Sequence, residues 1–507
     1  MINANSNPAP TDQVVNPFGV TDRWTAIPPR IRSVLTWFGV FVAVVVLKRD
    51  ALLLPASWDE SWAVLPGGLW LSDNGFNILG LAKQPLHFEF GPGTYALAPV
   101  TWMTGIVATF ARSTSVFLVS LRLVHMAIGA VGLREVYRFA RPVWSPTASV
   151  VLVVVTALVP VMNAQLGFMY LEIPIFTTGM LAINAGLAGR WGTATFWGAL
   201  ATSFKASGIL PLGAIVSAGF MAQRTMESFR RSVLVVLPAM AIGLIPVLLD
   251  KFVAMSERDL GHLLWVSWLQ IFRIPELAIG LLFIVLFGVL PDRSDRSSEP
   301  DVRLRLDTLS SLILMFIGFY LFALSFVVRT FFLPRYFIMI VPFVLFAAWE
   351  VGARRFGPRV AAVATGLLVV SMIINMSSTY LLDPNEVTTV GLESSNAYAE
   401  SLLLTNTILD RALQTGDPVY LSNNLWFRTQ YPRLGYVEVV PENAHLLTEL
   451  NQDDPPDTFV IVDSENSELV DDALELLGDQ QDYAFVSATA SRGILTARYV
   501  TFTRKSG

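Results

Sequence analysis

The sequence predicts a polytopic α-helical membrane protein, with about 11 spans plus juxtamembrane helices, that ends in an extracytoplasmic α/β domain. Two observations predict this class. Of the 507 residues, 53% are hydrophobic and only 15% are charged, which is more apolar surface than an ordinary soluble globule buries. The apolar residues also gather into runs of about 17 to 23, such as 232–249 and 308–328, the length that crosses ~30 Å of hydrocarbon as a helix.

Eleven runs are candidate spans, and arginines gather at every second connection between them, as the positive-inside rule requires of cytoplasmic ends. We therefore expect a plasma-membrane protein with a cytoplasmic N-terminus and with the C-terminal domain on the outer face. The predicted spans are 33–54, 115–138, 146–162, 173–189, 191–204, 206–222, 232–250, 268–290, 308–328, 336–351 and 360–377.

One further apolar segment, 93–110, does not fit this alternation. If it crossed the bilayer, Arg134, Arg138 and Arg141 would lie outside and every later connection would reverse. We expect it to be a juxtamembrane or re-entrant helix, whose backbone is tolerated at membrane depth when it packs against protein.

Composition divides the chain into three parts. Residues 1–30 are polar and rich in Pro and Asn, and are expected to form a disordered cytoplasmic tail. Residues 31–377 form the transmembrane domain, with an outer loop at 55–95. Residues 378–507 hold 20 Asp or Glu against 7 Lys or Arg, whereas the remainder of the chain is net positive by 8. This acidic part is predicted to be a soluble domain.

Short β-rich runs in the acidic part predict strands at 419–421, 459–463, 483–488 and 495–502, with a helix near 469–477. The chain has no cysteine, so neither disulfides nor thiolate metal sites are available. No nucleic-acid partner is expected.

Three carboxylates are candidate catalytic groups. Asp59 and Glu60 follow the first span, between tryptophans that favour the membrane interface. One of them would act as the general base that deprotonates an acceptor hydroxyl; the simpler interpretation is a solvated pair beside aromatic anchors. Glu172 precedes a predicted span with Pro174 in its first turn, where a carboxylate also interacts favourably with the helix dipole without any catalytic role.

Three cations on the same side are candidate ligands for a phosphate. Arg329 and Arg335 break the charge rule by lying on the outer face, and a guanidinium matches phosphate oxygens in a fork. Lys205 stands between two short apolar runs, where it either binds a lipid phosphate or extends to the interface. Weaker candidates for substrate binding are His87, Tyr95 and Tyr170.

The order and spacing of these motifs over roughly residues 30–380 resemble the GT-C class of glycosyltransferases. The resemblance is to the branch that contains protein O-mannosyltransferases and bacterial lipid A aminoarabinose transferases. It rests on the segments 120–124, 137–141, 170–174, 203–208 and 334–342. The family's first-loop catalytic carboxylate corresponds to Asp59, with Glu60 beside it, and its second-loop acidic residue to Glu172, where Glu replaces the more usual Asp. The segment 91–95 departs from the family's His- and Pro-rich loop, which weakens a role for His87.

The resemblance implies a polyprenyl-phosphate-linked sugar as donor, an acceptor hydroxyl on a glycan, lipid or protein, membrane lipids as surroundings, and inversion by direct displacement. A phosphate leaves as an anion, so a base and phosphate-binding cations suffice and no cofactor is required. A divalent cation held by the carboxylates is an option. The alternatives are a lipid or sugar transporter or flippase, suggested by the many spans, and an inactive GT-C-like assembly subunit.

Overall fold

The computed structural model describes most of the helical body and much of the C-terminal part. The described residues are 28–56, 60–84, 96, 98–211, 230, 233–234, 236–239, 241–242, 274–288, 317, 334–377, 397–451, 455–463, 483–492 and 495–505.

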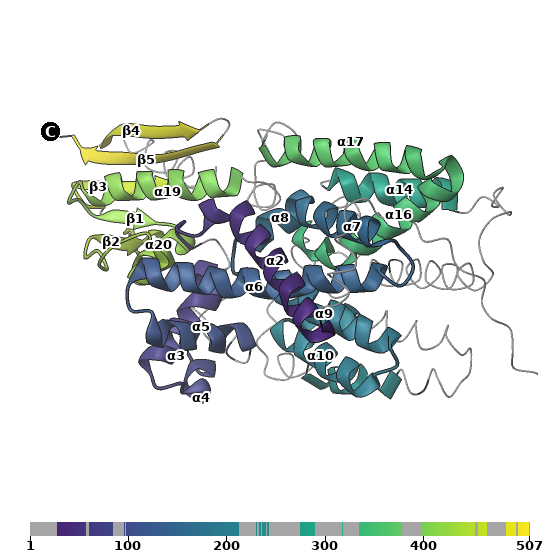
Figure 1. The fold of residues 1–507 in the computed structure, drawn as a ribbon. Helices are drawn as coiled ribbons and strands as arrows, with labels where there is room; N and C mark the ends of the chain where they lie inside the picture. Colours follow the sequence, from purple (N-terminus) through teal and green to yellow (C-terminus); the bar gives the residue numbers. More distant parts are fainter. Residues whose placement is uncertain are drawn as a thin grey trace, which may run out of the picture.

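The body is a bundle of helices that run between two ends of the molecule, with a β-sheet at one end (Figure 1). We call these the sheet end and the basic end, because Arg138, Arg354 and Arg355 lie in the last turns of helices at the latter. The helices of this bundle are α2 (Pro29–Leu47), α6 (Thr114–Ala140), α7 (Pro146–Leu158), α8 (Pro160–Leu166), α9 (Glu172–Leu187), α10 (Trp191–Phe204), α14 (Pro275–Gly288), α16 (Val341–Phe356) and α17 (Pro358–Ser377).

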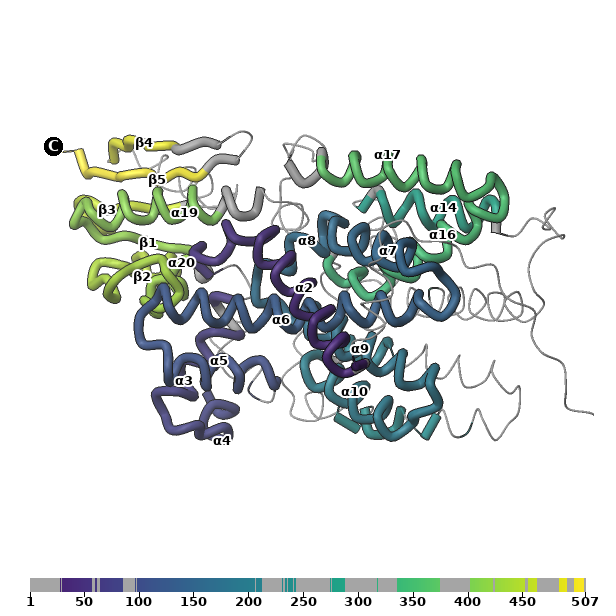
Figure 2. Tube along the Cα trace, in the orientation of Figure 1, coloured from purple at the N-terminus to yellow at the C-terminus, as the bar shows by residue number. Residues whose placement is uncertain are grey.

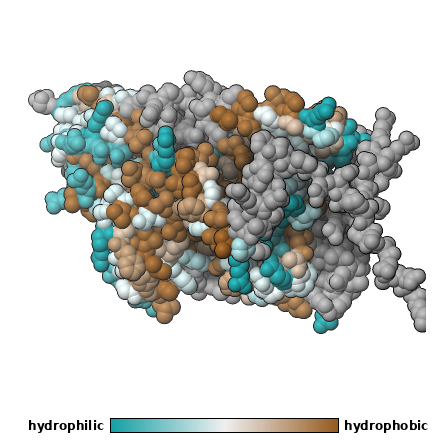
Figure 3. Space-filling view, in the orientation of Figure 1, coloured by the Kyte–Doolittle hydropathy of each residue, from teal (hydrophilic) through white to brown (hydrophobic). Residues whose placement is uncertain are grey.

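The protein is a helical membrane protein. Among the described residues, three segments are long and apolar enough to cross a bilayer, Arg30–Leu47, Thr114–Ala140 and Arg335–Phe356, and α7 with α8 makes a fourth if this bent pair counts as one. Apolar side chains gather on the visible face over α2, α3 and α5, whereas hydrophilic ones gather on the C-terminal sheet (Figure 3). The total of eleven spans stays a prediction.

Three predicted spans have different boundaries or shapes from those expected. The span predicted at 33–54 ends as a helix at Leu47, where three consecutive charged residues begin and a 3-10 turn, η1 (Arg49–Ala51), follows. The span predicted at 146–162 is bent by 76° at Pro160, which lacks the N–H that would continue the α7 ladder. The span predicted at 206–222 begins as a short 3-10 helix, η3 (Ala206–Ile209).

The span predicted at 336–351 also starts differently, as the 3-10 helix η5 (Pro334–Ile340), before α16 begins. Tight turns then close the hairpins at the basic end. Gly357, with φ of +86°, separates α16 from α17, and Gly189, with φ of +68°, separates α9 from α10. Glycine adopts this left-handed conformation without steric cost. The predicted spans 232–250 and 308–328 lie almost wholly outside the described residues.

The outer-loop region forms short helices beside the sheet end of α6. They are the π-helix η2 (Glu60–Val64), α3 (Leu65–Asp73), α4 (Ile78–Ala82) and α5 (Pro99–Phe110). At 12 residues, α5 is about 18 Å long, well short of ~30 Å of hydrocarbon. Its length agrees with the prediction that 93–110 does not cross.

The C-terminal part contains a five-stranded sheet in the order β2-β1-β3-β5-β4. β1 pairs in parallel with β2 and β3, whereas β5 pairs antiparallel with β3 and β4. Four strands match the predicted runs, but β2 and the helices α19 and α20 were not predicted, and 469–477 lies outside the described residues. The elements are α19 (Ala397–Leu413), β1 (Val419–Leu421), α20 (Asn423–Gln430), η7 (Pro432–Leu434), β2 (Ala444–Leu446), η8 (Leu447–Glu449), β3 (Thr458–Asp463), β4 (Tyr483–Arg492) and β5 (Leu495–Arg504).

The sheet is docked firmly on the helical body by the turn 432–436. Ala56 donates its N–H to Leu434 O at 2.7 Å and accepts from the Tyr436 hydroxyl at 2.6 Å, so both backbone groups of Ala56 are held by residues far along the chain. Buried side chains of α19, β1 and α20 share one hydrophobic core with the start of α6 and the loop after α2. The tube in Figure 2 shows the ends of α2 and α6 meeting this part of the chain.

This docking predicts a cross-link. A Cβ placed on Gly435 would lie 3.7 Å from the Pro55 Cβ, within the ~3.5–4.5 Å that disulfides need. Because the chain has no cysteine, a Pro55→Cys/Gly435→Cys double variant carries only that pair. We expect mild oxidation to form the disulfide, detected as a cross-linked peptide by mass spectrometry.

The matched control pairs Pro55→Cys with Gly416→Cys. Gly416 is also a left-handed glycine of the C-terminal part, but nothing lies within 4 Å of its Cβ position. Equal cross-linking of both pairs, or of neither, would contradict the docked arrangement.

Candidate functional site

The candidate site is a buried cluster of charges at the sheet end, built around Glu172. Lys205 Nζ lies 3.1 Å from Glu172 Oε1, and Arg335 Nε lies 3.5 Å from the same oxygen. The three residues come from the start of α9, the end of α10 and η5. Glu172 and Arg335 are almost fully buried, whereas the Lys205 side chain is 20% exposed. These three side chains together carry a net charge of plus one.

Two tyrosines complete the cluster. Tyr336 lies under the Lys205 ammonium, 4.3 Å from Nζ to the ring centroid, and its hydroxyl is 3.2 Å from the same nitrogen. The Arg335 guanidinium lies 4.7 Å above the ring of the fully buried Tyr170. The aromatic faces attract both cations and fix their positions. The side chains of the cluster are therefore preorganised before any ligand arrives.

Interruptions of the α-helical backbone determine the positions of Lys205 and Arg335. Lys205 follows the last residue of α10 in extended conformation, and η3 then folds back so closely that a Cβ on Gly208 would lie 2.0 Å from Ala201 O. Only glycine permits this approach. Arg335 lies in the 3-10 segment that precedes α16, so its side chain stays at the sheet end of the bundle.

The electrostatics keep Glu172 ionised. Burial alone raises the pKa of Glu172, but the charges of Lys205 and Arg335 and the Lys205 hydrogen bond outweigh burial, so the pKa lies below its usual value. Such a carboxylate is a weak base. Glu172 Oε2 is buried and has no hydrogen-bond partner in the described part of the chain, so the carboxylate orients the two cations through one oxygen.

A second buried ion pair lies next to the first and holds the loop after α2. Arg122 of α6 is 3.4 Å from Glu60 Oε2, and both side chains are 1% exposed. The Arg122 guanidinium also donates to the carbonyl oxygens of Ala51, Leu54 and Pro55, at 2.6 Å and 2.9 Å for the last two. Glu60 accepts from the Met169 backbone N–H. The segment 168–172 therefore connects the two ion pairs.

The structure brings together four of the predicted site residues, Glu172, Lys205, Arg335 and Tyr170. Glu60 lies in the neighbouring pair with Arg122. Asp59, Arg329, His87 and Tyr95 lie outside the described residues.

Sequence reasoning did not single out two residues of these clusters. The sequence could have indicated that Arg122 has a buried partner, because a charge inside a long apolar run is energetically costly unless it is paired. Tyr336 carried no signal beyond its position next to Arg335.

The carboxylates of the two clusters each have a cation partner. Within the described ranges, no three His, Asp or Glu side chains are grouped so that they could hold a metal ion. A divalent cation bound to Glu60 or Glu172 would lie beside the cations that already pair with these carboxylates. The expectation of a divalent cation therefore stays a prediction.

No family model matches the chain, and no curated protein matches it. Among solved structures, the chain is similar to ArnT from Cupriavidus metallidurans bound to undecaprenyl phosphate, at 14% identity and a TM-score of 0.45, over 92% of this chain and 98% of that one.

The buried Arg122–Glu60 pair predicts a large loss of stability on truncation. Arg122→Ala would leave the Glu60 carboxylate and three backbone carbonyls without their donor. Breaking a buried pair costs about 3–5 kcal/mol. We expect a clearly lower midpoint of thermal unfolding for the detergent-purified protein. The control is Arg49→Ala, whose side chain is 76% exposed in a pair with Asp50 and should change stability little. Equal midpoints for the two variants would contradict this account of the pair.

Proposed function

We propose that the protein is a membrane glycosyltransferase that moves a sugar from a polyprenyl-phosphate-linked donor to an acceptor hydroxyl at the sheet end, with inversion. The Glu172–Lys205–Arg335 cluster carries this proposal. A planar guanidinium and an ammonium held side by side, with one carboxylate fixing both, suit an anionic phosphate better than a neutral ligand. Lys205 is the partly exposed member and would meet the phosphate first.

The leaving group explains why cations matter here. The acceptor oxygen attacks the anomeric carbon, and the bond between that carbon and the phosphate oxygen breaks. Negative charge then grows on the phosphate, which leaves as polyprenyl phosphate without receiving a proton. Lys205 and Arg335 would stabilise that charge in the transition state. Their fixed positions mean that little reorganisation is needed when the bond breaks.

The acceptor proton needs a base, and we assign that role to Asp59. The alternatives are less suited, because Glu60 is buried in its pair with Arg122 and Glu172 is held ionised between two cations. In this proposal Glu60 anchors the loop that carries Asp59, and Glu172 positions the phosphate-binding cations. Protonation of Asp59 balances the bond changes of the reaction.

A transporter or flippase and an inactive subunit are the competing classes. Buried charges in transporters tend to lie near the middle of the bilayer, at a repeat interface. In the described part of this chain the ion pairs of Glu172 and of Glu60 lie near the sheet end, whereas the buried Glu135 pairs with Arg134 and Arg138 near the basic end. The cluster that would bind the phosphate thus lies toward one end of the bundle, which favours chemistry at one face over passage across the membrane.

The base assignment predicts the effect of Asp59→Asn. The variant should lose transfer from a polyprenyl-phosphate sugar by about 10²–10⁴ in kcat while it still binds the donor, since the amide cannot accept the proton. Release of polyprenyl phosphate from a labelled donor measures kcat. Full activity in this variant would refute the assignment of Asp59.

The proposed phosphate site predicts that removing either of its cations lowers kcat/KM. Lys205→Ala and Arg335→Gln should each lower kcat/KM by about 10²–10³, because they remove charge that stabilises the departing phosphate. Arg49→Ala, an exposed cation at the same end of the bundle, is the matched control and should leave kcat/KM unchanged. A loss no larger than that of the control would exclude these residues from phosphate binding.

A further inference from the structure

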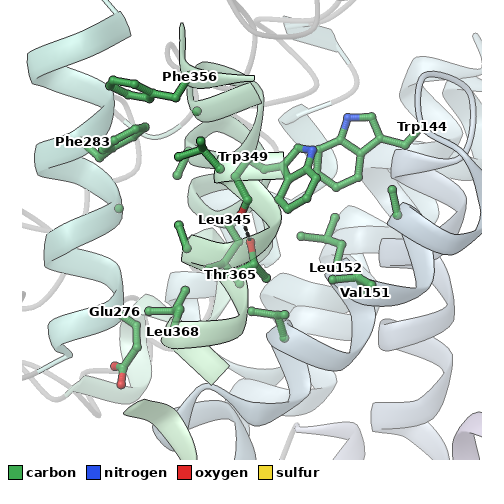
Figure 4. Close-up of a pocket in the computed structure, with 18 of the residues that line it drawn as sticks. Trp144, Val151, Leu152, Glu276, Phe283, Leu345, Trp349, Phe356, Thr365 and Leu368 are labelled. Atoms are coloured by element: carbon green, nitrogen blue, oxygen red, sulfur yellow. Dashed lines mark hydrogen bonds between the residues drawn. The ribbon is translucent and has the colours of Figure 1, made fainter. Parts of the chain in front are cut away.

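An apolar cavity of about 580 Å³ lies between α7, α14, α16 and α17 (Figure 4). Its lining is almost wholly aliphatic and aromatic, and includes Val155, Phe283, Trp349 and Leu368. The volume falls within the ~300–1,000 Å³ of ligand cavities. An unfilled cavity destabilises a fold in proportion to its volume, and apolar walls do not retain water. We therefore expect the cavity to hold an apolar group.

The cavity opens on the surface that faces lipid. Ile279, Phe356 and Val360 line it and are also exposed, by 60%, 47% and 53%. Further exposed apolar side chains of α14 and α17 include Leu282, Val285, Val363 and Leu367. A hydrocarbon chain from the surrounding membrane can enter between α14 and α17 without first passing through water.

The two ends of the cavity differ. In Figure 4 Glu276 lies at one end, and Trp144 and Phe356 lie at the other. Trp144 begins the connection into α7 at the basic end, and its indole N–H donates to Glu350. Tryptophan favours the level of the lipid headgroups. The Trp144 end is therefore placed where a headgroup would lie, and the Glu276 end where a chain would stop.

Arginines surround the Trp144 end. Arg141 donates to Trp144 O at 3.1 Å, and Arg354 lies 3.6 Å from Glu350. Arg359 is exposed and directly precedes the lining residue Val360. Glu350 offsets one of these charges, so the rim stays positive. Basic pockets between transmembrane helices bind the headgroups of anionic lipids.

From the apolar cavity and its basic rim, we propose that this site binds an anionic phospholipid. One acyl chain lies in the cavity, and the headgroup phosphate contacts Arg141 and Arg359. The site is distinct from the Glu172–Lys205–Arg335 cluster, because none of these three residues lines the cavity. The lipid would pack four helices together at the end of the bundle opposite the sheet.

The test uses full-length protein in nanodiscs and a phosphatidylglycerol with a photoreactive acyl chain. We expect cross-linked peptides from α7, α16 or α17. Ala364→Phe, which fills the cavity, should reduce this labelling at least about fivefold. Ala362→Phe is the matched control, because Ala362 is exposed on the same helix but does not line the cavity. Equal labelling of the two variants would overturn the site.

Competition by unlabelled lipids separates the possible occupants. Phosphatidylglycerol should compete better than phosphatidylcholine, and the Arg141→Gln/Arg359→Gln variant should reduce that preference by roughly fivefold per arginine. Both arginines are exposed, so this variant tests the headgroup without altering the core. Equal competition by the two phospholipids would overturn the anionic headgroup. Stronger competition by polyprenyl phosphate would overturn the phospholipid as occupant.

Discussion

The free-energy cost of burying charged side chains determines which segments meet at the sheet end of this protein. Glu172 is 6% exposed and Arg335 is 3% exposed, and an isolated charge at such a depth would be expelled or neutralised. Glu172 is stabilised in its buried position because it pairs with both Lys205 and Arg335. These pairs form only when α9, α10 and η5 meet. A single electrostatic constraint thus fixes three segments that are far apart in the sequence. A partly exposed ammonium is left at the rim, where a ligand can reach it.

The second constraint is the loop after α2, which is held from two directions. Arg122 binds its carbonyls from within the bundle, and Leu434 and Tyr436 bind Ala56 from the C-terminal part. Contacts from both sides fix the geometry of this loop. The C-terminal sheet therefore contributes to the architecture of the candidate site, since Tyr170 and Leu171 share a hydrophobic core with its strands β1 and β3.

Local patterns predicted much of this structure. The long apolar run at 115–138 became α6, and four β-rich runs became strands, because burial of one face leaves a periodic trace in the sequence. Lys205, Arg335 and Glu172 could be grouped because each interrupts apolar segments on the same predicted side. The pairing of Glu60 with Arg122 could not be predicted, since it depends on how α6 packs against a loop 62 residues away. Pro160 did give a local signal for the break between α7 and α8, because proline cannot continue the helix, although its sequence does not fix the angle of 76°. Strand β2 is too short to show a pattern.

In the proposed function the sheet end recognises a phosphate attached to a long prenyl chain. The most direct measurement compares the binding of polyprenyl phosphate with that of the uncharged polyprenol of equal length, in wild type and in Arg335→Gln. Hydrogen bonds to charged groups contribute about 1.5–3 kcal/mol, so the phosphate should bind at least about tenfold more tightly than the alcohol, and the variant should lose most of that difference. Equal affinity of the wild type for both lipids would contradict the account.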